Sequence, residues 1–150
     1  MQIDDPIFAE TVRQWRRGWW GGHWQPPEPL SIVQLMQAGS LDARLLALAW
    51  LLLEAHSSVL VAAEPPEAGK TTTLTALLEF LPPAVTRVYT RGFEETFSFV
   101  RQTDPAGTWI LCNEISPDLG VYTWGPAVRA LFSALEAGYA VATTMHADEP

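Results

Sequence analysis

Apolar and polar positions along the chain follow two periods, which predict short strands alternating with helices. Four segments rich in apolar and β-branched residues are predicted strands, 59–63, 85–90, 108–113 and 139–144, and the pattern of 85–90 is the weakest one. Four segments with helical spacing and recognisable ends are predicted helices: 32–37, 41–55, 71–80 and 127–137. Residues 92–103 fit neither period. Strands that alternate with helices in this way predict an α/β fold, with a mostly parallel sheet flanked by helices.

The ends of the predicted helices can be assigned to particular residues. Ser31 and Ser40 are the expected N-caps of the first two helices, and Gly39 is the expected stop of the first. The second helix, residues 41–55, is apolar around most of its circumference. A helix of that kind is expected to be buried between neighbours.

Residues 1–29 differ in composition from the rest and are predicted to be a separate lead-in segment, with the core at 30–150. The segment holds four of the seven tryptophans and ends in a proline-rich stretch at 26–29. Three interpretations are open: indoles that pack on the core, a patch that docks a protein partner, and contact with a membrane interface.

Composition and charge narrow the class of protein. At 150 residues, 48% of them hydrophobic and 17% charged, the chain is long enough for one domain with its own core. The net charge of −8 and the lack of a basic stripe argue against nucleic acid as a partner. The single cysteine, Cys112, is expected in the core of a protein kept in a reducing compartment. No apolar run approaches the roughly 20 residues of a membrane span, so the expected location is the cytoplasm.

The first candidate chemistry lies where the predicted strand 59–63 leads through a tight loop into the helix 71–80. The loop ends in Gly69, Lys70 and Thr71, the order of a phosphate-binding P-loop. Backbone N–H groups at the helix N-terminus would face the phosphates. Lys70 would reach the β- and γ-phosphates, and the Thr71 hydroxyl would hold Mg²⁺. This pattern makes a nucleotide the first ligand to consider.

The loop departs from the full pattern at its start. The position of the first glycine holds Glu64, and Pro65 and Pro66 follow, neither of which can donate an N–H. Glu67 adds a second carboxylate, and each carboxylate beside a triphosphate costs roughly 1 kcal/mol if solvated. We therefore expect a recognisable P-loop with weakened phosphate binding.

Two further positions offer what hydrolysis needs beyond phosphate binding. The apolar run 110–113 ends in Glu114, the form of a Walker B element, and a carboxylate at the carboxyl end of a parallel strand faces the ligand edge of the sheet. Glu114 would orient the attacking water or help to hold the water shell of Mg²⁺. The alternative is an ordinary acidic residue at a strand end. His146 follows the last predicted strand and is expected at the same edge.

The stretch from Pro29 to Pro150 resembles the secretion-system ATPases, the motors of type II and type IV secretion, pilus assembly and the archaellum. It is most similar to the pilus-assembly branch. The segments that carry the resemblance occur in the family's order: 29–41, 69–78, 113–115, 135–139 and 143–147. The first is similar to the family's helical lead-in, the second to its P-loop helix, and the third to a Walker B element in which glutamate carries the function. The last two together are similar to the run into its histidine box.

The resemblance implies a RecA-like P-loop NTPase core that hydrolyses ATP to ADP and phosphate with Mg²⁺. Six residues are then expected to form the site. Gly69, Lys70, Thr71 and Thr72 would bind the nucleotide, and Thr71 would also hold Mg²⁺, with Glu114 acting on the metal through water. Glu114 would be the catalytic carboxylate, and His146 a catalytic residue that senses the nucleotide. The resemblance also implies a hexameric ring, formed by self-association or with a full-length paralogue. Such a ring would work peripherally at the inner membrane, with the platform proteins of a secretion or pilus machine.

Other features depart from the family's pattern. In place of the family's acidic box, this chain has only the displaced Glu94 or Glu95. Ser116 stands where the family pattern has an arginine after the Walker B glutamate. The chain is therefore expected to be a reduced core, truncated after the histidine box. These departures support a second hypothesis, a non-catalytic or decayed paralogue that acts through protein contacts. A P-loop kinase that moves phosphate to a small molecule is the third.

Overall fold

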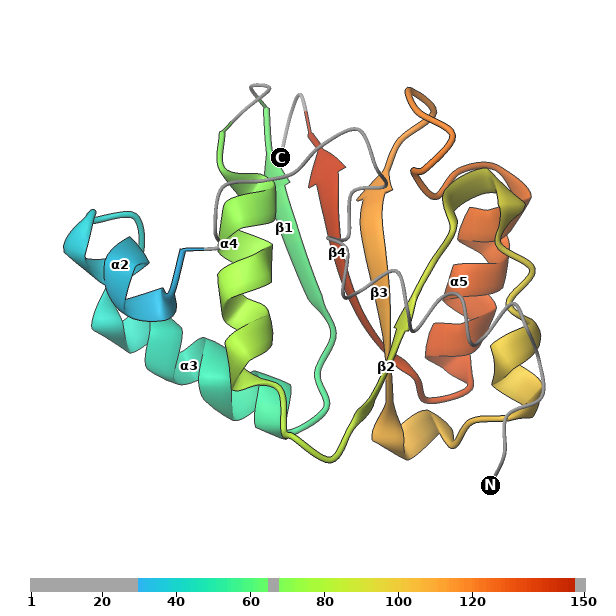
Figure 1. Cartoon of the computed structure of the whole chain (residues 1–150), viewed down its shortest axis with the longest axis horizontal. Helices are drawn as coiled ribbons and strands as arrows, with labels where there is room; N and C mark the ends of the chain where they lie inside the picture. The colour runs from blue at the N-terminus through green and yellow to red at the C-terminus, as the bar shows by residue number, and fades with distance from the viewer. Residues whose placement is uncertain (1–29, 65–67, 148–150) are drawn as a thin grey trace.

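The structure, a computed structural model, describes residues 30–64 and 68–147 and contains one sheet of parallel strands. The strands are β1 (Val59–Ala63), β2 (Thr86–Tyr89), β3 (Thr108–Ile115) and β4 (Ala140–His146), in the spatial order β1-β4-β3-β2. Every neighbouring pair is parallel, so the strands run toward the same edge of the sheet, at the top in Figure 1. The predicted α/β fold with a mostly parallel sheet is confirmed. The predictions for residues 1–29 and 65–67 lie outside the described residues.

Helices cover both faces of the sheet (Figure 1). They are α2 (Ile32–Gln37), α3 (Ala43–Glu54), α4 (Lys70–Leu77) and α5 (Pro126–Glu136). The segment 92–103, which fits neither period, forms two short 3-10 turns, Gly92–Glu94 and Ser98–Arg101, and a third, Pro105–Gly107, follows it. Among residues 30–64 and 68–147, no helix combines the length and the apolar character that crossing a bilayer requires.

Two hydrophobic cores form, one on each face of the sheet, because successive side chains of a strand point to opposite faces. On one face, Leu111 of β3 packs with Leu74 of α4. On the other, Ile110 and Cys112 pack with Leu131 of α5. Cys112 is fully buried, as predicted, and this burial raises the pKa of its thiol to about 11.

The start of α2 confirms the predicted cap. The Ser31 hydroxyl accepts the N–H of Gln34 at 3.3 Å, and the Gln34 side chain accepts the N–H of Ser31 at 2.8 Å, which is a reciprocal capping box. Gly39 follows the helix with φ of 72°, the left-handed conformation that a glycine adopts without strain. The sequence therefore identified both ends of this helix.

The predicted cap of the next helix is wrong. The N-cap of α3 is Asp42 instead of Ser40, and the helix begins two residues later than predicted. One carboxylate oxygen of Asp42 accepts the N–H groups of Arg44 and Leu45 at 2.8 and 2.9 Å. A carboxylate that accepts two amide groups at a helix N-terminus outcompetes a serine hydroxyl nearby, since it also interacts favourably with the helix dipole.

The predicted burial of this helix is wrong as well. Leu46 and Leu53 enter the core, but four other leucines of α3 are exposed: Leu45 by 49%, Leu48 by 53%, Leu51 by 65% and Leu52 by 46%. The reason is the place of α3 in the fold, at the margin of the sheet where only one of its sides meets other elements (Figure 1).

Candidate functional site

Three of the predicted site residues meet at the carboxyl edge of the sheet, although they come from distant parts of the chain. Lys70 begins α4, Glu114 lies near the end of β3, and His146 ends β4. Because β4 lies between β1 and β3, its last residues stand between the ends of these two strands. The register pairs His146 with Ala63 of β1, and Thr144 with Glu114. His146 is thus the last residue of the strand, and not the residue after it as predicted.

Gly69 and Lys70 form the start of α4, the helix that follows the candidate P-loop. Gly69 is the N-cap with φ of 80°, in the left-handed region, and as a glycine it has no side chain to cap the helix. The N–H groups of the first turn of a helix have no partner inside the helix, so here they are left for another acceptor. Thr71 and Thr72 lie half-buried in this first turn, directly after Lys70.

The Lys70 ammonium is buried, and the described part of the chain offers it no carboxylate partner. The residue is 7% exposed, and no described carboxylate lies within ion-pair distance of Nζ. Its nearest polar contacts are the two ring nitrogens of His146, at 3.3 and 3.4 Å. A buried ammonium is unfavourable unless an anion or several acceptors compensate it, so this position is suited to an anionic ligand.

Glu114 is held at its position by both its backbone and its side chain. Its carbonyl oxygen accepts the N–H of Thr123 at 2.8 Å, and its Oε2 lies 3.4 Å from the Thr144 hydroxyl. The register of β3 against β4 shifts between Leu111 and Glu114, a bulge that changes the direction of the strand where the carboxylate leaves it. The residue is 7% exposed, so the carboxylate lies almost entirely inside the protein.

The second oxygen of this carboxylate has no hydrogen bond. Glu114 Oε1 is buried, and the described residues offer it no partner of hydrogen-bond geometry. His146 Nε2 lies 3.3 Å away, close enough for an ion pair when the imidazole is protonated. A buried carboxylate oxygen with a free lone pair can accept a hydrogen bond from a ligand or from a water molecule.

His146 connects the two charged groups. Its Nε2 lies 3.3 Å from both Lys70 Nζ and Glu114 Oε1, and its Nδ1 lies 3.3 Å from the carbonyl oxygen of Glu64. The residue is exposed, unlike the two groups that it contacts. The imidazole therefore contacts both Lys70 and Glu114, and it also contacts the backbone at the first position of the candidate P-loop.

Two residues of this site were missed by sequence reasoning. The Thr144 hydroxyl, fully buried, donates to the carbonyl of Asn113 at 2.8 Å beside Glu114. Tyr122 follows β3 in the chain, and burial first, then the charges of Glu114 and Asp118, raise the pKa of its phenol. Only the strand register and the loop after β3 bring these residues to the site, and neither can be read from spacing.

The displaced acidic residues of the loop after β2 have a structural role. The Glu95 carboxylate accepts the N–H groups of Phe97 and Arg91, at 2.8 and 3.1 Å, and lies 3.7 Å from the Arg91 guanidinium. These contacts hold a turn in which Phe97 has φ of 54°. Glu95 therefore fixes its own loop with the oxygens that an acidic box would offer to a ligand.

The residues present are compatible with Mg²⁺ in the P-loop mode. Within the described ranges, no three His, Cys, Asp or Glu side chains gather as they do in metal sites made entirely by protein. Magnesium at a P-loop takes most of its ligands from phosphate and water and needs only a hydroxyl and a carboxylate from the protein. Thr71 and Glu114 are the residues that would supply them.

Comparison with known proteins gives no further guidance, since no family model and no curated protein sequence matches this chain.

Proposed function

We propose that the chain is the ATP-binding and ATP-hydrolysing core of a P-loop, RecA-like ATPase, of the kind that drives secretion or pilus assembly. ATP with Mg²⁺ would bind at the carboxyl edge of the sheet, between the N-terminus of α4 and the end of β3. The observation that carries this proposal is the buried Lys70 ammonium, which has no described carboxylate partner and lies at an uncapped helix N-terminus. A phosphate group would compensate both features at once.

The roles of the residues follow from their surroundings. Lys70 and the backbone N–H groups after Gly69 would bind the β- and γ-phosphates. The hydroxyl of Thr71 would bind Mg²⁺. Glu114 would orient the attacking water through Oε1, the oxygen that has no hydrogen bond. His146, in contact with both charged groups, would have to move away from Lys70 as phosphate arrives, and in this way it would report nucleotide binding to Glu114.

A second candidate is a non-catalytic relative that acts through protein contacts. The observation that favours it is Glu64, which holds a carboxylate where a glycine is expected. The backbone carbonyl of Glu64 contacts His146, so the start of the loop is already engaged by the protein. Under this hypothesis, Lys70 stays against the imidazole and phosphate does not displace it.

Calorimetric titration of Mg-ATP into the full chain separates the two hypotheses. The Lys70→Met variant removes the charge and keeps most of the shape, whereas Arg129→Met removes one positive charge from an exposed position of α5. We expect saturable binding that Lys70→Met abolishes and Arg129→Met leaves unchanged. Binding that is followed by phosphate release supports the ATPase. Binding without turnover, or no binding at millimolar ATP, supports the non-catalytic relative.

A further inference from the structure

The imidazole of His146 faces one hydrogen-bond donor and two acceptors at once. The ammonium of Lys70, which can only donate, lies 3.3 Å from Nε2 and 3.4 Å from Nδ1. The carbonyl oxygen of Glu64 lies 3.3 Å from Nδ1, and the carboxylate oxygen Oε1 of Glu114 lies 3.3 Å from Nε2. A neutral imidazole has one N–H group and one free lone pair, so it can satisfy Lys70 and only one of the two acceptors.

The geometry of the ring shows which acceptor it satisfies. Nδ1 and the Glu64 carbonyl have the geometry of a hydrogen bond, whereas Glu114 Oε1, at the same distance from Nε2, has no hydrogen-bond partner among the described residues. The N–H group therefore lies on Nδ1 and donates to Glu64, which leaves the lone pair of Nε2 to accept from Lys70. With this tautomer, the imidazole connects the Lys70 ammonium to the backbone at the start of the candidate P-loop.

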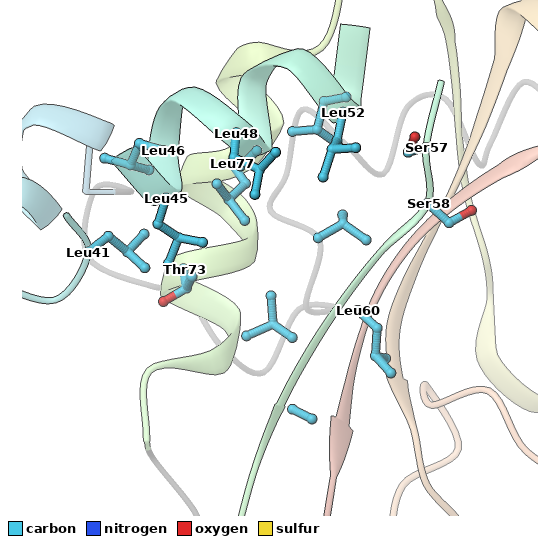
Figure 2. A pocket seen from close by; sticks show the side chains of 15 residues that line it. Leu41, Leu45, Leu46, Leu48, Leu52, Ser57, Ser58, Leu60, Thr73 and Leu77 are labelled. Carbon is cyan, nitrogen blue, oxygen red and sulfur yellow. The ribbon is translucent and has the colours of Figure 1, made fainter. Parts of the chain in front are cut away.

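The backbones on both sides of this contact are fixed, so only side chains can change it. Lys70 begins α4, whose Leu74 is fully buried in the core, and Thr73 and Leu77 of the same helix line an apolar groove between α3, α4 and β1 (Figure 2). His146 ends β4, which is held to β1 by parallel pairing. Its side chain is 36% exposed, so the ring can turn toward solvent without a change in the packing of the sheet.

We propose that His146 is a built-in competitor of the nucleotide, which holds Lys70 in the empty site and must turn away before phosphate can bind. This inference rests on the proposed nucleotide site and adds a regulation to it, because the strength of the imidazole contact sets part of the affinity for nucleotide. A phosphate oxygen is a stronger partner for an ammonium than a neutral imidazole, so phosphate can displace the ring. A shift of the Glu64 carbonyl would loosen the ring and release Lys70 in the same way.

An imidazole that stays in place and binds phosphate beside Lys70 is the alternative, and the assigned tautomer opposes it. The single N–H group is already donated to Glu64, so it is not available to a ligand. The other ring nitrogen, Nε2, presents a lone pair, and a lone pair repels the negatively charged oxygens of a phosphate. The ring can therefore accept from Lys70, but it cannot assist an anion there.

The test measures the binding of a non-hydrolysable ATP analogue with Mg²⁺ by calorimetric titration of the full chain. His146→Ala removes the competitor and leaves Lys70 in place. Thr73→Val is the control, since it alters the same helix at the apolar groove (Figure 2) and touches none of the candidate site residues. Circular dichroism confirms that both variants are folded.

A second measurement reports the hydrogen bonds of the ring without any nucleotide. Nitrogen-15 NMR of the histidine side chains, recorded at about pH 8 where free imidazole is neutral, shows which ring nitrogen carries the proton. The signals of His146 are identified as those that His146→Ala removes.

We expect His146→Ala to bind the analogue about tenfold more tightly than the native chain, because the native chain must first break a hydrogen bond to a charged group. Binding by Thr73→Val should stay within about twofold of native, as for a position with no shared partners. The NMR spectrum should show His146 protonated at Nδ1 in the free chain, with signals that shift when the analogue binds. A gain in affinity distinguishes a competitor from a structural residue, whose loss would leave binding equal or weaker.

Three outcomes would overturn this proposal and leave the nucleotide site standing. Equal affinity of the native chain and His146→Ala would mean that the imidazole does not oppose binding. Weaker binding by His146→Ala would make the imidazole a ligand of the phosphate. Protonation of His146 at Nε2 in the free chain would exclude the hydrogen bond from Lys70 to that nitrogen. Absence of binding in both the native chain and His146→Ala is a different result, since it would overturn the proposed nucleotide site as well.

Discussion

Replacement of Thr144 by valine tests how the protein holds its candidate catalytic carboxylate. Valine has nearly the shape of threonine, so Thr144→Val removes the hydroxyl and leaves the packing of β4 intact. In the native chain this hydroxyl donates to the carbonyl of Asn113 at 2.8 Å and lies 3.4 Å from Oε2 of Glu114. Both partners are buried and would remain without a substitute for the lost group.

The magnitude follows from these contacts. Loss of one buried hydrogen bond, with an acceptor left unsatisfied, costs about 1–3 kcal/mol of the free energy of unfolding. For catalysis, Glu114 would lose the contact to one of its two carboxylate oxygens and would rotate more freely about its last side-chain bonds. We expect ATP turnover to fall about tenfold while the affinity for Mg-ATP stays within about twofold, because Thr144 orients the carboxylate without touching the nucleotide.

The neighbouring threonine is a matched control. Thr143 is 4% exposed, and its hydroxyl donates to the carbonyl of Thr144 within the same strand, at 3.3 Å. Its side chain points to the opposite face of the sheet, since successive residues of a strand alternate. Thr143→Val should therefore destabilise the protein by a similar amount in urea unfolding and leave the turnover number unchanged.

Equal turnover in the two variants would refute this reasoning, whatever their stabilities. If both variants lost activity in proportion to their loss of stability, Thr144 would be a structural residue of β4. If neither lost activity, Glu114 would not need the hydroxyl, and its orientation would have to come from the bulge and from Thr123.

Further predictions concern four other positions. Gly92→Ala should destabilise the protein by about 3 kcal/mol or more in urea unfolding, because a left-handed φ of 66° costs an alanine about 1–2 kcal/mol and its Cβ would overlap the Gly120 carbonyl oxygen. Gly120→Ala is the control: no atom lies within 4 Å of its added Cβ, so the free energy of unfolding should change by less than about 1 kcal/mol. Glu114→Gln should keep Mg-ATP binding and abolish phosphate release, and loss of binding in calorimetry would exclude its catalytic role. Glu64→Gly should tighten Mg-ATP binding about fivefold by removing a carboxylate beside the phosphates, and an unchanged affinity would mean that the loop does not bind them. Since burial raises the thiol pKa of Cys112 from 9.0 to about 11, its contribution to stability is complete below pH 9 and is lost as pH rises toward 11. Over that interval, the free energy of unfolding in urea should fall by about 2–3 kcal/mol more for the native protein than for Cys112→Ser. Parallel plots of this free energy against pH for the two proteins would contradict the prediction.

The periodic parts of the fold were predictable from sequence, because each strand and helix carries its own pattern. The middle of β3, residues 109–112, is apolar without interruption because both faces of the strand are covered, and the sequence shows this directly. The burial of α3 was not predictable, because its composition indicates an apolar helix but cannot tell which of its sides meets another element. Its cap was missed for a related reason: Ser40 and Asp42 are both good caps, and only the geometry of the first turn selects one of them.

The candidate site shows the same division at the scale of single residues. Lys70, Glu114 and His146 were predicted separately, each from its position at the end of a strand or the start of a helix, and the parallel sheet brings them together. Thr144 escaped notice because its role depends on a bulge that places it opposite Glu114. A one-residue change of register would turn its hydroxyl to the other face, and a register of this kind is set by tertiary pairing.

The way in which the site separates its charges is itself an argument for a ligand. An ammonium and a carboxylate buried in one cluster for structural reasons would gain most from direct contact, since an unpaired buried charge is costly. Here Lys70 and Glu114 form no ion pair with each other, both lie 3.3 Å from Nε2 of His146, and Oε1 of the carboxylate has no hydrogen-bond partner among the described residues. This arrangement sacrifices stability that a simple ion pair would supply. We infer that the site is arranged for a ligand that brings a negative charge to Lys70 and donates a hydrogen bond to Glu114. A phosphate group with its attacking water offers both.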